Sequence, residues 1–312
     1  MLFSSMTFLF VFLPVTLAVY YLAPAQMRNL VMLAASLFFY AWGEPVYIIL
    51  MLLSILMNYY CGLDIDGKRN SPQLARRSLI FAVAANVLVL GFFKYYGLIM
   101  ETVNGTLPVD IPYRVLPLPI GISFYTFQAL SYIVDVYRGE ARAQKKFTWF
   151  ASYICMFPQL IAGPIIRYVD IEEQLRQRSF GIVKFGRGAM FFIRGLAKKV
   201  VIANSIGTVY EQVMQLPVGT VSVLTSWVGC LAYAFQIYFD FSGYSDMAVG
   251  LGKMFGFEFR RNFHYPYVSK SITEFWRRWH ISLSTWFREY VYIPLGGNRC
   301  GGQRNMVNLI LV

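Results

Sequence analysis

The residue types best suited to acid–base chemistry lie together in the segment 271–288, around one of only two histidines in the chain. The run Ser271-Ile-Thr-Glu274 is a capping box, so it predicts a helix that begins here. At 100° per residue, one face of that helix carries a histidine, a cation, two hydroxyls and large apolar side chains. Its members are Thr273, Trp276, Arg277, His280, Leu283, Ser284 and Phe287.

His280 is the candidate catalytic residue of this face, and Trp276, Arg277 and Ser284 are candidates to line a substrate path. Histidine exchanges a proton near neutral pH, and acyl transfer to a hydroxyl needs a base that takes the hydroxyl proton. The alternative is a packed or hydrogen-bonded helix histidine, which spacing alone favours. The second histidine, His264, lies in a proline-containing loop, and we interpret it as a surface residue.

Two carboxylates, Asp240 and Asp246, follow the charge-free run 212–239. A carboxylate at membrane depth is costly and is usually functional or paired, so both are candidates to line the same path. The alternative is that both lie at a membrane interface, where they cap the next segment.

Composition indicates the kind of protein to which these residues belong. Of the 312 residues, 57% belong to the set AVILMFWYC, 14% are charged, and the net charge is +12. Soluble domains are roughly 45–50% apolar and about 25% charged, whereas disorder requires low hydrophobicity. These values exclude a disordered chain, disfavour a soluble enzyme and indicate a membrane protein with basic loops. We expect no nucleic-acid partner, because no soluble basic domain is visible, and no metal site, because the four cysteines form no CxxC motif.

Charge-free runs approach the length that a bilayer span requires, about 20 residues, at several places along the chain. We therefore expect an all-α, polytopic membrane helix bundle. The basic loop 64–77 predicts the cytoplasmic side, and counting back through three spans puts the N-terminus outside. The runs are 1–27, 29–43, 45–63, 78–93, 115–134, 147–166 and 212–239, with shorter ones at 200–210 and 305–312.

The run 147–166 does not fit simple spanning. The loops that flank it, 135–146 and 167–187, are both basic, so both are expected inside. Pro158, Gly163 and Pro164 interrupt the run, and we therefore expect a re-entrant or broken helix. Such backbone is tolerated at membrane depth only where protein or water surrounds it.

Long blocks of the chain resemble the membrane-bound O-acyltransferase family, and most of all its bacterial branch that acetylates alginate and similar exported polysaccharides. The most specific block is Trp276-Arg-Arg-Trp-His280, which continues to Tyr290. The resemblance implies an acyltransferase with a many-helix membrane fold and a tunnel, and it matches His280 to one of two prominent family histidines. The other blocks are 38–45, 119–127, 158–164, 236–246, 262–267 and 292–299.

The family's other histidine lies in a Trp-His-Gly context, which this sequence does not contain. We therefore expect one membrane-embedded domain over residues 1–312 that is incomplete at its C-terminus and lacks the second, catalytic histidine. The resemblance implies no bound cofactor, and an acyl donor from the cytoplasm, either acetyl-CoA or an acyl carrier. It also implies membrane lipid, a periplasmic acetyl-transfer protein and an exported polysaccharide as partners. The expected location is the bacterial inner membrane, crossed several times, with the N-terminus in the periplasm.

Two functions from other classes stay open at this point. A polysaccharide or lipid exporter would share the composition and the broken helix, although no internal repeat of the transporter kind is evident. A non-catalytic membrane scaffold would account for the missing Trp-His-Gly histidine.

Overall fold

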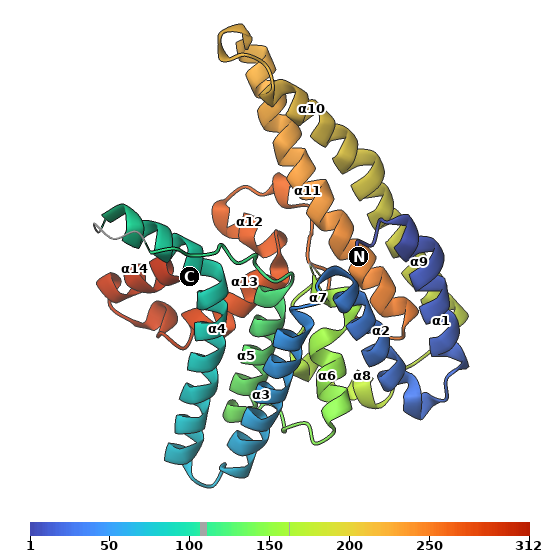
Figure 1. Ribbon diagram of the computed structural model, residues 1–312, viewed down its shortest axis with the longest axis vertical. Coiled ribbons are helices and arrows are strands. Elements are labelled where there is room, and N and C mark those ends of the chain that lie inside the picture. The colour runs from blue at the N-terminus through green and yellow to red at the C-terminus, as the bar shows by residue number, and fades with distance from the viewer. Residues whose placement is uncertain (107–110, 162) are drawn as a thin grey trace. The chain divides into compact units, whose positions relative to one another are not determined.

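The computed structural model describes residues 1–106, 111–161 and 163–312, and these residues form helices joined by turns and irregular segments (Figure 1). No β-strand occurs among them, so the all-α prediction is confirmed. The chain divides into two compact units. Unit 1 contains Met1–Ala23, a short piece that ends at Ile166, and Arg176–Val312, whereas unit 2 contains Pro24–Ile161 and Arg167–Leu175. The expectation of a single domain over 1–312 stays a prediction.

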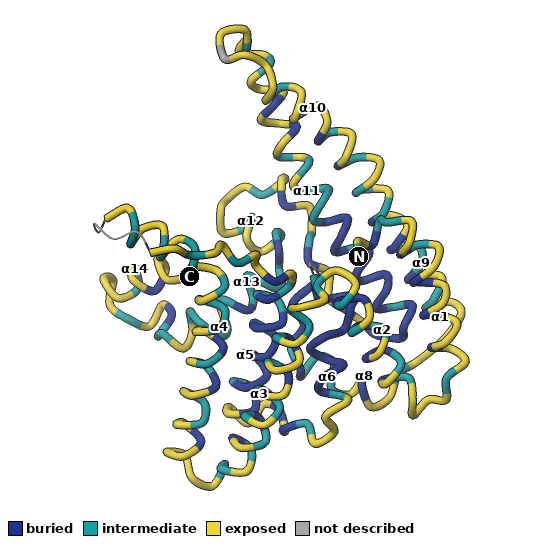
Figure 2. The backbone as a smooth tube through the Cα atoms, in the orientation of Figure 1, coloured by how far each residue is buried: buried dark blue, intermediate teal, exposed yellow. Residues whose placement is uncertain are grey.

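Unit 2 is built around α5 and α6, which are largely buried (Figure 2). Tyr132 packs against Phe150 and Tyr168, with ring centroids 4.7 and 5.1 Å apart. Its hydroxyl accepts a hydrogen bond from the Gln144 backbone N–H at 3.0 Å. Paired hydroxyls allow these large rings to lie in a core. The elements are η2 Ala25–Met27, α2 Arg28–Gly43, α3 Ile48–Gly67, α4 Pro72–Thr106, α5 Ile122–Arg138, α6 Phe147–Cys155, α7 Phe157–Leu160 and α8 Tyr168–Arg176.

Helices α3 and α4 are the two that are long and apolar enough to cross a membrane, among the residues described. A buried pair of amides joins them. Asn58 Nδ2 donates to Asn86 Oδ1 at 3.1 Å, and Asn86 Nδ2 donates to Asn58 Oδ1 at 2.8 Å. Interhelical amide bonds of this kind hold apolar helices together. Helix α4 continues to Thr106, and residues 107–110 lie outside the described part.

The predicted break within 147–166 is confirmed. Helix α6 ends at Cys155, because the backbone at Met156 turns extended (φ −50°, ψ 111°). Pro158 then lies in the first turn of α7, where a proline costs no hydrogen bond. After α7 the described residues up to Arg167 form no helix.

Unit 1 is organised by α11, which packs against α9 and α10. Two glycine pairs set the spacing of α9 and α11. A Cβ atom on Gly195 would lie 2.4 Å from the Gly243 carbonyl oxygen, and one on Gly250 would lie 2.6 Å from the Gly188 carbonyl oxygen. Only glycine permits so close an approach of two backbones.

The remaining elements of unit 1 include both 3₁₀ and π-helical turns, written η. They are η1 Phe8–Phe12, α1 Leu13–Leu22, α9 Ile182–Ala197, η3 Lys198–Ala203, α10 Asn204–Met214, η4 Val218–Thr220, α11 Val223–Met254, η5 Pro266–Val268, α12 Ile272–Arg278, α13 Ile281–Phe287, η6 Arg288–Tyr292, η7 Gly297–Arg299 and α14 Gly302–Leu311.

Candidate functional site

The predicted capping box is confirmed at the start of α12. Ser271 Oγ accepts a hydrogen bond from the Glu274 backbone N–H at 3.1 Å. The Glu274 carboxylate reaches back to the backbone N–H of Lys270 at 2.9 Å, one residue earlier than the motif implies. The same carboxylate pairs with Arg278 at 2.8 Å. This segment therefore fixes where α12 begins.

The expectation of one continuous helix through His280 is wrong. Helix α12 ends at Arg278, Trp279 is extended (φ −101°, ψ 131°), and His280 is left-handed (φ 42°, ψ 54°) before α13 begins at Ile281. A left-handed residue other than glycine is uncommon, and such residues cluster at functional sites. The face predicted for a straight helix is therefore assembled from two short helices.

The segment 262–264 stabilises this break by satisfying the backbone groups that the helix leaves open. The His264 N–H donates to the Arg278 carbonyl, and the Asn262 carbonyl accepts from the Ile281 N–H, both at 2.9 Å. Asn262 Oδ1 accepts from both the backbone N–H and the hydroxyl of Ser282, each at 3.0 Å. Asn262, which is 1% exposed, was not identified as a site residue, since its role depends on a partner 20 residues away.

His280 is buried beside aromatic rings, and it lies outside the two helices that can cross a membrane. Its ring meets Phe241 of α11 edge to face at 4.8 Å, and Phe263 lies 6.4 Å away. Burial lowers the pKa of His280 to about 4, so the imidazole is neutral at neutral pH. A neutral imidazole is able to accept a proton. His264 is exposed, as its interpretation as a surface residue requires.

A cavity of about 730 Å³ lies against α12 and α13. It brings together three of the predicted path-lining residues, Trp276, Arg277 and Ser284, although their helices are not continuous. His280 and both predicted carboxylates are absent from its wall. The lining residues are Thr273, Trp276, Arg277, Ile281, Ser284, Thr285, Arg288 and Asn298. The cavity thus offers two guanidinium groups, several neutral hydrogen-bonding groups and an indole.

Arg288 and Asn298 were not identified from the sequence. Arg288 follows Ser284 by four residues, and α13 continues directly into η6, so the two side chains lie on the same helix face. This spacing could have identified Arg288 from the sequence. Asn298 reaches the cavity through a turn at 296–299. Gly296 (φ 110°) and Gly297 (φ 51°) form this turn, and the Tyr292 hydroxyl donates to the Asn298 side chain.

Asp240 and Asp246 lie within α11 and form ion pairs, so they do not cap a following segment. Lys198 Nζ lies 2.6 Å from the Asp246 carboxylate, and Lys199 pairs with Asp240. Both lysines belong to the π-helical turn η3. The structure therefore favours charge pairing between two packed elements as the explanation of these carboxylates.

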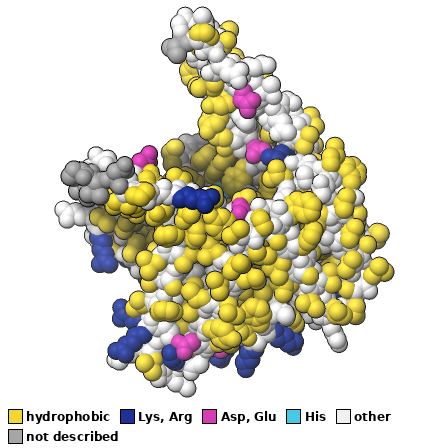
Figure 3. All heavy atoms as spheres, viewed as in Figure 1, with side chains coloured by type: hydrophobic (Ala, Val, Ile, Leu, Met, Phe, Trp, Pro, Cys, Tyr) yellow, Lys and Arg dark blue, Asp and Glu magenta, His cyan; other side chains and the backbone are white. Residues whose placement is uncertain are grey.

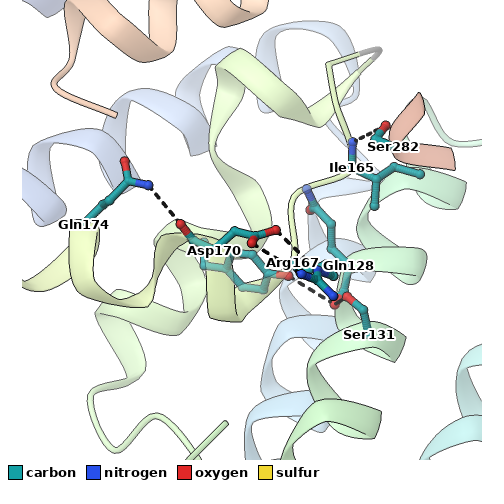
Figure 4. Close-up of polar contacts among 8 residues, drawn as sticks. Gln128, Ser131, Ile165, Arg167, Asp170, Gln174 and Ser282 are labelled. Carbon is teal, nitrogen blue, oxygen red and sulfur yellow. Dashed lines mark hydrogen bonds and ion pairs between the residues drawn. The ribbon is translucent and has the colours of Figure 1, made fainter. Parts of the chain in front are cut away.

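The last residues of the broken segment contact the start of α13. The Ile165 backbone N–H donates to the Ser282 hydroxyl at 3.0 Å, as Figure 4 shows. Ser282 is thereby held by Ile165 and by Asn262 at once. In unit 2, Figure 4 also shows Arg167 paired with Asp170 at 3.3 Å, which fixes the first turn of α8. The broken segment is thus tied by hydrogen bonds at its end.

Within the described part of the chain, no three histidine, cysteine or acidic side chains lie close enough together to hold a metal ion. The four cysteines are unbridged.

The model of the membrane-bound O-acyltransferase family matches residues 139–312. The chain is 47% identical to "Probable alginate O-acetylase AlgI" of Azotobacter vinelandii and 46% identical to the protein of the same name of Pseudomonas aeruginosa. It is 36% identical to "Peptidoglycan O-acetyltransferase" of Helicobacter pylori. Each alignment covers 100% of this chain and 63%, 60% and 65% of the relative, respectively. The chain thus spans somewhat less than two thirds of the length of these relatives.

Proposed function

Because this chain belongs to the membrane-bound O-acyltransferase family and is therefore membrane-embedded, we propose that it transfers an acetyl group across the membrane for O-acetylation of an exported polysaccharide such as alginate. Similarity along the whole chain to alginate O-acetylases is the observation that carries this proposal. The peptidoglycan O-acetyltransferase relative supports the same reaction class with another glycan acceptor.

The cavity beside α12 and α13 supplies the groups that acyl transfer needs. When a hydroxyl oxygen attacks an acyl carbon, negative charge develops on the acyl carbonyl oxygen, and fixed donors stabilise that charge. Arg277 and Arg288 are the cationic donors of the cavity, and Ser284 adds a hydroxyl. Trp276 offers an apolar wall to the acyl group. The new ester bond forms as the bond between acyl carbon and donor breaks, and the hydroxyl proton must leave.

We assign acceptance of that proton to His280. Its imidazole is neutral at neutral pH, as a proton acceptor must be. Ile281, the next residue, and Arg277, three residues earlier, both line the cavity. His280 is not among the residues that line the cavity, so this assignment requires its imidazole to reach the cavity during the reaction. Asp240 and Asp246 have no direct part in this scheme, because lysines neutralise them.

The donor and the partners belong to the same proposal. The acyl donor comes from the cytoplasm, as acetyl-CoA or an acyl carrier, and a periplasmic protein passes the acetyl group on to the polymer. The protein would lie in the inner membrane with its N-terminus in the periplasm. The basic residues Lys68, Arg69, Arg76 and Arg77 at the turn between α3 and α4 support this orientation, because they belong on the cytoplasmic side.

Acetyl content of the secreted polymer tests the proposal in cells that carry the protein as their source of acetylation. His280→Ala is expected to lower acetylation by about 10²–10⁴-fold, the usual effect of losing one general base. His264→Ala, at an exposed histidine, is the matched control and should retain acetylation. Protein levels in the membrane are measured for both.

The outcomes separate the competing functions. Loss of secreted polymer on deletion, with acetylation of the remaining polymer intact, would point to an exporter. Unchanged acetylation in the His280→Ala cells at equal protein level would favour a scaffold and remove the chemical role of this histidine.

A further inference from the structure

Two cavities of about 440 Å³ each lie beside the α3–α4 hairpin in unit 2, and Tyr60 lines both of them. One cavity is polar at its end and the other is mainly apolar. We call the two together the α3–α4 groove. The polar end is lined by Tyr60, Cys61, Asp64, Arg77, Ser78 and Phe81, and the apolar end by Leu50, Leu53, Ser54, Leu56, Met57, Tyr60, Asn86, Val89 and Thr126.

All of the α3 residues that line the groove except Leu56 form one helical stripe. Residues 50, 53, 54, 57, 60, 61 and 64 recur at intervals of three and four, so they share one face of the helix. From Leu50 to Asp64 the helix rises about 21 Å, at 1.5 Å per residue. One leaflet of a bilayer has about 15 Å of hydrocarbon and several ångströms of headgroup. The groove therefore matches the length of one phospholipid in one leaflet.

The polar end carries a cation with no partner of its own. Arg77 is exposed, and no described residue forms an ion pair or a hydrogen bond with it. The nearby carboxylate is already neutralised, because Asp64 accepts from Lys68 Nζ at 2.7 Å and from the Ser78 hydroxyl at 2.5 Å. The electrostatic potential beside Arg77 is therefore positive, and it would attract an anion. Figure 3 shows basic side chains gathered at this end of the hairpin and hydrophobic ones along its flank.

The apolar end is open to a lipid chain. Leu53 is 58% exposed and Leu56 is 41% exposed, on a helix of a membrane-embedded protein. Asn86 is the one amide side chain among the residues given for its wall, and its amide is paired with that of buried Asn58 by two hydrogen bonds. A hydrocarbon chain in the groove would therefore displace no hydrogen bond.

We propose that the α3–α4 groove binds one glycerophospholipid, with its phosphodiester at Arg77 and one acyl chain laid along α3 toward Leu50 and Val89. The polar and apolar ends share Tyr60. This site is separate from the cavity beside α12 and α13, and the proposal rests on family membership and on the groove, not on the acyl-transfer reaction.

Lipid titration of the purified, delipidated protein, followed by native mass spectrometry, tests the proposal. Phosphatidylglycerol is the probe. Arg77→Gln is expected to weaken the first bound lipid about five-fold, because one basic side chain near a lipid headgroup contributes about that factor. Arg76→Gln is the matched control: it removes the same charge from the neighbouring position of α4, which does not line the groove. A photoreactive group on the acyl chain should label the α3 peptide that contains Leu53 and Met57.

Three results would overturn the proposal. Equal weakening by Arg77→Gln and Arg76→Gln would show only general attraction between lipid and a basic loop. Equal binding of glycerophosphoglycerol, which has no acyl chains, would show a phosphate site that needs no lipid. Exclusion of lipid together with a dimer that dissociates on Leu53→Asn would show that a second copy of the chain covers the groove.

Discussion

Burial of a neutral His280 has a consequence for stability that is open to measurement. In the folded chain the pKa of His280 is lowered from 6.5 to about 4 by burial. At 1.36 kcal/mol per pH unit, this difference corresponds to ~3 kcal/mol. Below pH 6.5 the unfolded chain takes up a proton on this histidine, whereas the folded chain does not until about pH 4. The contribution of His280 to the free energy of unfolding is therefore complete above pH 6.5 and is lost progressively as the pH falls toward 4.

The perturbation is His280→Asn, because asparagine tolerates the left-handed backbone of this position better than most residues. The assay is thermal unfolding of the purified protein in detergent, followed by tryptophan fluorescence from pH 7.5 to 4.5. The variant should lose less stability than the wild type over this range, by up to ~3 kcal/mol. His264→Asn, at the exposed histidine, should follow the wild-type curve. Parallel curves for wild type and His280→Asn would refute a buried, neutral imidazole.

Three further predictions concern packing and pairing. Asn262→Ala leaves two partly buried donors, the backbone N–H and the hydroxyl of Ser282, without this acceptor, so denaturant unfolding should show a loss of about 1–3 kcal/mol. Gly195→Ala places a Cβ against the α11 backbone and should cost about 3 kcal/mol or more of folding stability. Gly186→Ala, in the same helix, meets nothing within 4 Å and should stabilise the helix by up to about 1 kcal/mol. The shifts of the thermal unfolding midpoint should therefore have opposite signs in these two variants. A double-mutant cycle of Lys198→Met and Asp246→Asn should give a coupling of about 1 kcal/mol that weakens in high salt, and a coupling of zero would contradict the ion pair.

Local signals in the sequence were sufficient for several elements. The capping box at Ser271 placed the start of α12 because its two hydrogen bonds involve residues within four positions. Pro158 and the glycine–proline pair after it predicted the break near α7 for the same reason, since proline acts on its own turn. The apolar runs predicted helices, although among the helices that the structure describes only α3 and α4 have the length and composition of a span.

The break at His280 was not predictable in this way. The segment 279–281 contains neither glycine nor proline, so its pattern is compatible with a straight helix. What ends the helix is the set of hydrogen bonds from Asn262 and His264, which are far away in the sequence. Asn298 could not be identified as a cavity residue for a similar reason, because its position depends on a turn that follows the broken helix. The lysine partners of Asp240 and Asp246, 41 and 48 residues away, were hidden by the same kind of distance.

The two glycine pairs between α9 and α11 also bear on how this unit can move. Gly188 faces Gly250 and Gly195 faces Gly243, so the two helices are antiparallel and each has two contact glycines seven residues apart. A slide of one helical turn, about 5.4 Å, would push residues with side chains into spaces that hold only hydrogen. We therefore expect α9 and α11 to move together as one rigid body. A hinge for any conformational change in unit 1 should then lie outside this helix pair. The left-handed backbone at His280, where the chain is already bent between α12 and α13, is one such position.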